Sequence, residues 1–267
     1  MIITFLTDFG LQDDFVGTCH GVMTRIARDA QIIDITHGVR PQQVLQGALV
    51  LANTLPYMPE GVHLAVVDPG VGTDRRAIAL QGGDGRLYVG PDNGLLVPAA
   101  ERLGGVDAAW ELVAEEYRLE PVSDTFHARD VFAPAAAHVA AGVDPREMGR
   151  AVEPASLVRL PLPEPSLGDG WARAHVIMVD RFGNIQLNLS TSHLERLGIE
   201  PGVQVELVLQ LERYYAVTAR TFADGRPGDI ILYEDAYWNA SLAINGGSAA
   251  ETLSLQPGDD LRLRVID

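Results

Sequence analysis

The chain has 267 residues, of which 47% are apolar and 21% charged, as in folded globular proteins with a core of their own. Its 36 acidic residues outweigh 20 basic ones, all arginine, which gives a net charge of −16. This acidity disfavours phosphate backbones and anionic membranes, so we expect neither a nucleic-acid nor a membrane partner, and it would suit a positively charged substrate as well as solubility.

Short apolar runs alternate with segments of helical spacing over residues 1–150. The strands are expected at 2–6, 32–35 and 63–67, and the helices at 13–28, 42–55 and 131–139. The opening run lacks a basic flank, so it is typical of a first strand rather than of a signal peptide. We therefore predict an α/β domain over residues 1–160, with a mainly parallel sheet covered on both faces.

A segment rich in proline and glycine at 161–171 predicts a semi-rigid linker. Beyond it the pattern changes to short alternating strands separated by turn signals, expected at 175–179, 203–209, 230–233 and 261–265. We therefore predict a second, smaller all-β domain over residues 172–267, built as a barrel or a sandwich.

Two carboxylates directly follow apolar strands, Asp8 after the first and Asp68 after the third. Ligands collect at the carboxyl ends of the strands in parallel sheets. Asp68 opens the loop Asp68-Pro-Gly-Val-Gly-Thr-Asp-Arg-Arg, whose glycines permit close backbone approach. Arg75 in this loop could hold the carboxylate ionised and oriented. A structural turn with a surface ion pair explains the same motif equally well.

The loop that contains Asp8 continues to Asp13 and has neither a GxGxxG nor a Walker A pattern. A nucleoside without phosphates is therefore a better candidate ligand than a pyrophosphate, with the acidic groups accepting bonds from ribose hydroxyls. For Asp13, a role as a helix cap is as good an explanation.

Histidine is the side chain best suited to proton exchange near neutral pH, and the chain has seven. His127 stands out among them because polar residues flank it at the start of a predicted helix. His63 and His138 lie inside apolar runs and fit core or surface positions better. No HExxH or similar spacing appears, so we expect no metal at the site. The single Cys19 lies among small and apolar residues and is expected to be a packed thiol, which favours a cytoplasmic location.

Five motifs, in the same order along the chain, make the sequence similar to the SAM hydroxide adenosyltransferase family, which is related to the SAM-dependent fluorinase and chlorinase. The motifs are Thr7-Asp-Phe-Gly, Val67-Asp-Pro-Gly-Val-Gly-Thr, Gly90-Pro-Asp-Asn-Gly-Leu-Leu, Thr125-Phe-His-Ala-Arg-Asp and Asp180-Arg-Phe-Gly-Asn-Ile. The resemblance implies an N-terminal α/β domain, a C-terminal β-barrel, and a homotrimer with active sites at subunit interfaces. It also implies hydrolysis of S-adenosyl-L-methionine (SAM) to adenosine and L-methionine, with no cofactor.

In that resemblance the catalytic triad falls on Asp68, Arg75 and His127, which would hold and polarise a water for attack on the ribose C5′ carbon. The implied substrate contacts are Asp8 at the ribose, Asp13 and Asp180 toward the methionine end, Phe182, Asn184 and Phe222 at the adenine, and Asn245 beside them. Two alternatives remain, a SAM- or adenosine-binding protein without turnover and a SAM-dependent halogenase.

The sequence departs from the halogenases at three places. Asp68 would repel a halide, and His127-Ala128 replaces a Tyr-Ser pair of the fluorinase. The chain also lacks the loop that the fluorinase inserts after its third strand. At Ala236-Tyr237 the fluorinase has Ser-Arg, which binds the methionine carboxylate, so a backbone amide or a hydroxyl would have to take over that contact here.

Overall fold

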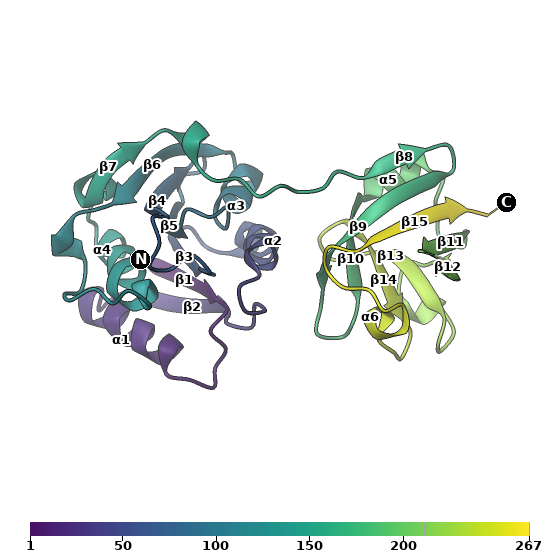
Figure 1. Ribbon diagram of the computed structural model, residues 1–267, viewed down its shortest axis with the longest axis horizontal. Helices are drawn as coiled ribbons and strands as arrows, with labels where there is room; N and C mark the ends of the chain where they lie inside the picture. The colour runs from purple at the N-terminus through teal and green to yellow at the C-terminus, as the bar shows by residue number, and fades with distance from the viewer. Residues whose placement is uncertain (211, 267) are drawn as a thin grey trace. The chain divides into compact units, whose positions relative to one another are not determined.

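The computed structural model describes residues 1–210 and 212–266. They form two compact units, Met1–Leu160 and a second unit that begins at Pro161 (Figure 1). Within these ranges no helix has the length and apolar character needed to cross a bilayer.

The first unit is built on a seven-stranded sheet in the order β2-β1-β3-β5-β4-β6-β7. Its strands are β1 (Ile2–Thr7), β2 (Gln31–Thr36), β3 (Val62–Val66), β4 (Ala77–Gly82), β5 (Leu87–Pro91), β6 (Val106–Leu112) and β7 (Gly149–Val152). The pairs among β2, β1, β3 and β5 are parallel, and those of β4 with β5, β6 with β4 and β7 with β6 are antiparallel. β4 is antiparallel to β5, and β6 is antiparallel to β4, so β6 runs in the same direction as the parallel strands. The predicted α/β class with a mainly parallel sheet is confirmed.

Helices cover both faces of this sheet, α1 (Phe15–Ile26) and α4 (Ala133–Ala140) one face and α2 (Val44–Thr54) and α3 (Val97–Arg102) the other (Figure 1). Successive side chains of a strand point to opposite faces, so each buried strand contributes side chains to the cores on both faces of the sheet. In β1, Ile3 and Phe5 pack with α1 and α4, whereas Leu6 packs with α2. This burial on both faces is why β1 and β3 appear as apolar runs in the sequence.

Short helical turns complete the first unit. They are η1 (Leu55–Tyr57), η2 (Glu115–Tyr117), the π-helical turn η3 (Ala128–Phe132), η4 (Pro145–Met148) and η5 (Pro154–Ser156). The helix predicted at 131–139 therefore exists as α4, preceded by η3.

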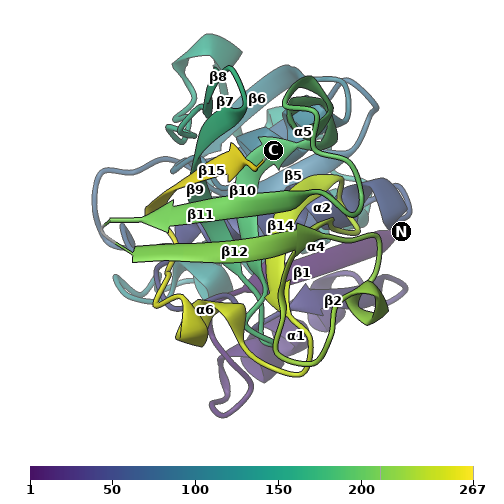
Figure 2. The same cartoon turned by 90° about the vertical axis from the view of Figure 1, so that its right-hand side faces the viewer.

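The second unit is a closed barrel. Its strands follow the order β10-β14-β13-β12-β11-β15-β9-β8, and β10 also pairs with β9, which closes seven strands on themselves and leaves β8 outside. Figure 2 shows this unit with β11 and β12 side by side. The strands are β8 (Ser166–Gly168), β9 (Trp171–Val179), β10 (Ile185–Ser190), β11 (Gln204–Leu209), β12 (Glu212–Thr218), β13 (Ile230–Glu234), β14 (Asn239–Ile244) and β15 (Asp260–Val265), with α5 (Thr191–Arg196), η6 (Phe222–Asp224) and α6 (Ala249–Thr252) between them.

Alternate side chains fill the barrel interior, for example Val205, Leu207 and Leu209 of β11. The interior of a small barrel is a core of packed side chains, so this alternation is the pattern that the sequence displays. Of the two all-β architectures that the sequence allowed, the structure is the barrel.

Candidate active site

Two neighbouring parallel strands bring Asp8 and Asp68 to the same edge of the sheet. Thr7 at the end of β1 pairs in register with Val66 at the end of β3. Asp8 follows Thr7 directly and Asp68 comes two residues after Val66, so both carboxylates lie where parallel sheets bind ligands.

Asp68 and Arg75 form a two-pronged ion pair. Arg75 Nε lies 3.0 Å from each carboxylate oxygen of Asp68, and Nη2 lies 2.5 Å from Oδ2. Their side chains are only 6% and 10% exposed, and the guanidinium stacks 5.0 Å over the ring of Phe132. The guanidinium contacts both carboxylate oxygens and an aromatic ring, so its orientation is fixed, unlike that of an arginine in a surface ion pair. The alternative explanation, a structural turn with a surface ion pair, is therefore excluded for Asp68 and Arg75.

Arg75 also binds His127, with 2.9 Å between Nη2 and Nδ1. A guanidinium has donors and no acceptor, so Nδ1 of His127 must accept this bond, and the neutral ring then carries its proton on Nε2. Burial lowers the pKa of His127, and the neighbouring Arg75 charge lowers it further. At neutral pH the ring is therefore an uncharged donor through Nε2.

Two further contacts hold the loops that carry these groups together. Gly72 has φ +77°, and a Cβ at this position would lie 2.6 Å from the carbonyl oxygen of Asp124, three residues before His127. The buried Asp130 carboxylate accepts from the Ser123 amide at 2.9 Å and pairs with Arg129. The π-helical turn that begins after His127 is a feature frequent at functional sites.

Asp68 and His127 line a cavity of about 190 Å³, whereas Arg75, which joins them, is not part of its lining. Asp8, Gln42, Asp68, His127 and the rings of Phe9 and Phe126 are among its lining residues. Gln42 has φ +66°, which is costly for a residue with a side chain, and its amide donates to Asp8 Oδ2 at 2.7 Å. The backbone thus orients Asp8 at the expense of local strain.

The second unit has its own cavity, of about 360 Å³. Its walls include four of the residues implied by the family resemblance, Asp180, Phe182, Asn184 and Phe222. Asp180 accepts from the Phe182 and Asn184 amides at 2.8 and 2.9 Å, and from the Asn184 side chain at 2.8 Å. Phe182 and Phe222 are 69% and 48% exposed, which is unusual for phenylalanine and leaves their faces open to a planar ligand.

Two expected ligands lie outside these cavity linings. Asp13 is exposed on the loop before α1. Asn245 uses its side-chain amide to hold the Gly225 carbonyl at 2.8 Å, close in sequence to Phe222. Both remain predictions as substrate contacts.

A polar cluster in the second cavity, made of the half-buried Asp235 and the buried Gln186 and Ser241, has no signal in the sequence. Asp235 accepts from the Gln186 amide at 2.5 Å and from the Ser241 hydroxyl at 3.0 Å, and all three line the cavity. Asp235 comes just after β13, but the rule that pointed to Asp8 and Asp68 holds for parallel sheets and does not extend to this barrel. Asp235 also accepts from the Tyr237 amide at 2.8 Å, so that amide is already engaged.

Comparisons with known proteins give one consistent result. Models of the SAM hydroxide adenosyltransferase N-terminal and C-terminal domains match residues 3–149 and 174–262. The chain is 51% identical to the (R)-S-adenosyl-L-methionine hydrolase of Salinispora tropica, over 98% of this chain and 97% of that protein. It is 32% identical to a fluorinase of Actinoplanes sp., over 96% and 95% of the two chains. A crystal structure of an uncharacterized conserved protein from Thermotoga maritima superposes with a TM-score of 0.91 at 34% identity, covering 98% of this chain and 99% of that one.

Proposed function

We propose that this chain, which belongs to the SAM hydroxide adenosyltransferase family, hydrolyses S-adenosyl-L-methionine to adenosine and L-methionine. The relative that is 51% identical along its full length carries the name of this activity, whereas the fluorinase relatives are more distant. The observation that carries the proposal is the contact chain from Asp68 through Arg75 to His127 at the wall of a cavity.

The reaction needs a positioned water rather than a strong acid. The water oxygen forms a bond to the ribose C5′ as the C5′–S bond breaks. The electron pair of that bond goes to sulfur, which changes from a sulfonium to the neutral thioether of methionine, and the water loses a proton. Because the sulfonium is already a good leaving group, catalysis consists of alignment, partial proton removal and exclusion of bulk water. No cofactor is part of the proposal.

The hydrogen-bond donors and acceptors of Asp68, Arg75 and His127 determine the role of each residue in the reaction. His127 offers the Nε2 proton to the oxygen of the attacking water, and Asp68 accepts one of that water's protons. Arg75 fixes both partners and stabilises hydroxide character as it develops. Its bond to His127 Nδ1 keeps the ring in the tautomer that this arrangement requires.

The same geometry argues against the two alternatives. A halide would have to bind beside the Asp68 carboxylate, which repels an anion in a site where both side chains of the ion pair are at most 10% exposed. A protein that only binds SAM has no use for a buried carboxylate, guanidinium and imidazole joined in one chain of contacts.

The remaining substrate contacts are part of the proposal. Asp8, oriented by the Gln42 amide, would bind the ribose hydroxyls. Phe182, Phe222 and Asn184 would enclose the adenine, and Asp180 would bind the methionine ammonium group. For the methionine carboxylate, the Tyr237 amide already donates to Asp235, so another backbone amide or a hydroxyl would have to bind it.

We also propose that the protein works as a homotrimer whose active sites lie at subunit interfaces. The cavity of about 190 Å³ beside the triad is smaller than the range of about 300–1,000 Å³ that usually encloses a ligand of SAM's size, which favours completion by a second surface. A cytoplasmic location is also proposed, supported by the free, buried Cys19 thiol, whose pKa burial raises to about 12.

The decisive experiment follows the oxygen atom. Purified protein is incubated with SAM in water enriched in ¹⁸O, without added metal, and the products are analysed by mass spectrometry. The expected result is adenosine with one ¹⁸O at the 5′ position and unlabelled methionine. Adenosine without the label would overturn the mechanism, and bound SAM with no products over hours would favour the binding protein.

Two additions to this assay test the finer points. Fluoride or chloride added in excess should yield no 5′-halogenated nucleoside. Because the name of the Salinispora relative specifies the (R) form, the two sulfonium epimers of SAM are assayed separately, with faster turnover expected for (R).

A further inference from the structure

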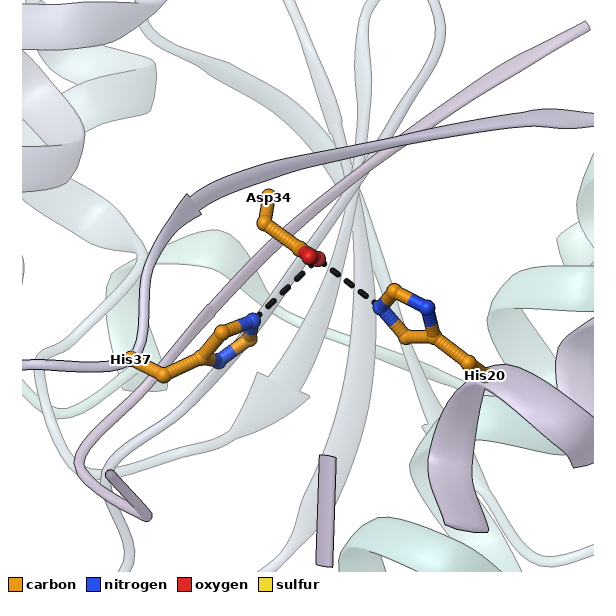
Figure 3. Close-up of side chains that lie close together, drawn as sticks. All are labelled: His20, Asp34 and His37. Atoms are coloured by element: carbon orange, nitrogen blue, oxygen red, sulfur yellow. Dashed lines mark hydrogen bonds and ion pairs between the residues drawn. The ribbon is translucent and has the colours of Figure 1, made fainter. Parts of the chain in front are cut away.

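Three side chains from separate elements of the first unit converge (Figure 3), and none of them lines the cavity beside Asp68 and His127. His20 comes from α1, Asp34 from β2 and His37 from the loop after β2. One carboxylate oxygen, Oδ1 of Asp34, lies 2.8 Å from His20 Nε2 and 3.1 Å from His37 Nε2. One ligand atom from each residue falls within 4.8 Å of the others.

His37 is held so that Nε2 points into this cluster. Its ring is buried, with a 3% exposed side chain, and Nδ1 is bonded to the Thr7 hydroxyl at 2.8 Å. Within the described part of the chain Nε2 has no hydrogen-bond partner, and Asp34 Oδ1 lies 3.1 Å from it. A buried polar atom without a hydrogen bond is costly and calls for another partner.

A cation satisfies this arrangement better than a hydrogen bond does. When the Nδ1–H of His37 donates to the Thr7 hydroxyl, the other ring nitrogen, Nε2, can offer its lone pair. Two imidazole nitrogens and one carboxylate oxygen are the ligand set that divalent transition metals take in proteins.

We propose that His20, Asp34 and His37 bind a divalent transition-metal ion, with Zn²⁺ as the best match to this ligand set. Metal–ligand bonds of about 2.0–2.2 Å at tetrahedral angles place ligand atoms about 3.3 Å apart. The two separations from Asp34 Oδ1, 2.8 and 3.1 Å, need an expansion of a few tenths of an ångström, and the ligand atoms of the two histidines lie within 4.8 Å of each other. Asp34 and His20 are 39% and 34% exposed, so the ion can enter from solvent and take water as a fourth ligand.

The position of the site suggests a structural role for the ion. The His37 ring contacts the hydroxyl of Thr7, the last residue of β1, and the His37 carbonyl accepts from the Gly10 amide in the following loop at 2.7 Å. Asp8 lies between these two contacts. An ion that fixes His37 therefore fixes the loop that carries Asp8, and it takes no part in bond breaking. The proposal does not depend on the reaction.

The test is a titration of the full chain, prepared without a polyhistidine tag and treated with a chelator. Isothermal titration calorimetry with ZnCl₂ should give one ion per chain. His20→Ala and Asp34→Ala each remove one ligand at a partly exposed position, so the fold is retained, and the Kd should rise by roughly a hundredfold or more. The matched control is His175→Ala, because His175 is a partly exposed histidine paired with Asp260 outside the cluster. Its Kd should equal that of the unaltered protein.

Co²⁺ provides a second readout that does not depend on heat. Visible absorption bands of a low-symmetry Co²⁺ site should develop up to one equivalent, and be absent in His20→Ala and Asp34→Ala. The proposal is overturned if the unaltered protein binds no Zn²⁺, or if the two ligand variants bind Zn²⁺ as tightly as His175→Ala does.

Discussion

Arg75 donates from Nη2 to Nδ1 of His127 across 2.9 Å, although 52 positions separate the two residues in the chain. This bond sets the imidazole tautomer and places the ring beside the Asp68 carboxylate that the same guanidinium holds.

Asp68→Ala and His127→Ala should each keep SAM binding and lose turnover. Each change removes one contact to the attacking water, which typically lowers the rate by about 10²-fold or more. Binding is measured by calorimetry and turnover by adenosine release. Unchanged turnover in both variants would remove the triad from the mechanism.

Arg75→Lys should lower kcat by roughly 10²-fold although the charge is kept, because an ammonium group cannot reproduce the fork that reaches Asp68 and His127 together. The matched control is Arg76→Lys, next in the chain and paired with the buried Asp92. Steady-state kinetics at saturating SAM should show near-normal kcat for the control. Equal losses in both variants would indicate a general structural effect.

His127 should titrate below its usual pKa of 6.5, because burial and the Arg75 charge both disfavour the protonated ring. The active form is then present at neutral pH, and the rate falls only as the pH drops through the lowered pKa. Long-range ¹H–¹⁵N spectra of the ring should report the Nε2–H tautomer at pH 7. A midpoint above 6.5, or a proton on Nδ1, would contradict the assigned roles.

Phe222→Ala should weaken adenosine binding, since stacking of a base on an aromatic ring is worth about 1–3 kcal/mol. Phe222 is 48% exposed and stands 5.1 Å from the ring of Tyr233 in the second cavity. The expected result is a higher KM with little change in kcat. Tyr215→Ala, an aromatic that is 53% exposed on β12 outside this cavity, is the control and should bind adenosine normally.

His63 should make the fold sensitive to acid. It is fully buried, bonds to the Thr4 hydroxyl at 2.9 Å, and burial lowers its pKa to about 4. Between pH 6.5 and about 4 the unfolded chain binds the extra proton, so this contribution to stability is complete above 6.5 and lost as the pH falls through that window. The loss is on the order of 3 kcal/mol at 1.36 kcal/mol per pKa unit.

Urea unfolding at pH 7 and pH 4 measures the effect. His63→Gln should show a smaller difference between the two pH values than the unaltered chain, whatever its absolute stability. An identical difference would assign the acid sensitivity to other groups.

The sequence predicts the buried central strands of the first sheet, but it does not predict β5 or the antiparallel strands beyond it. β1 and β3 are covered on both faces and therefore appear as apolar runs, with Asp8 and Asp68 at their ends. β5 contains glycine and proline, and β6 has two acidic residues, Asp107 and Glu111, among its apolar ones, so neither has a strong strand pattern. Neighbouring strands determine these elements more than their own sequences do.

The candidate site likewise has one part that the sequence predicts and another that only the folded structure shows. The contact between Asp68 and Arg75 lies within one loop and is foreseeable from seven residues of separation. The bond to His127 depends on the tertiary fold, and only the ordered motifs single this histidine out. The cluster of His20, Asp34 and His37 has no familiar ligand spacing, because its members come from a helix, a strand and a loop that meet only in the folded chain.

Gly72 has a consequence for how inactive variants should be interpreted. A side chain there would collide with the Asp124 carbonyl and push the two loops apart, which would separate Arg75 from His127. A random screen for loss of activity would therefore return Gly72 together with the triad, although Gly72 has no functional group. Such a hit would report the spacing between two loops rather than a missing chemical role.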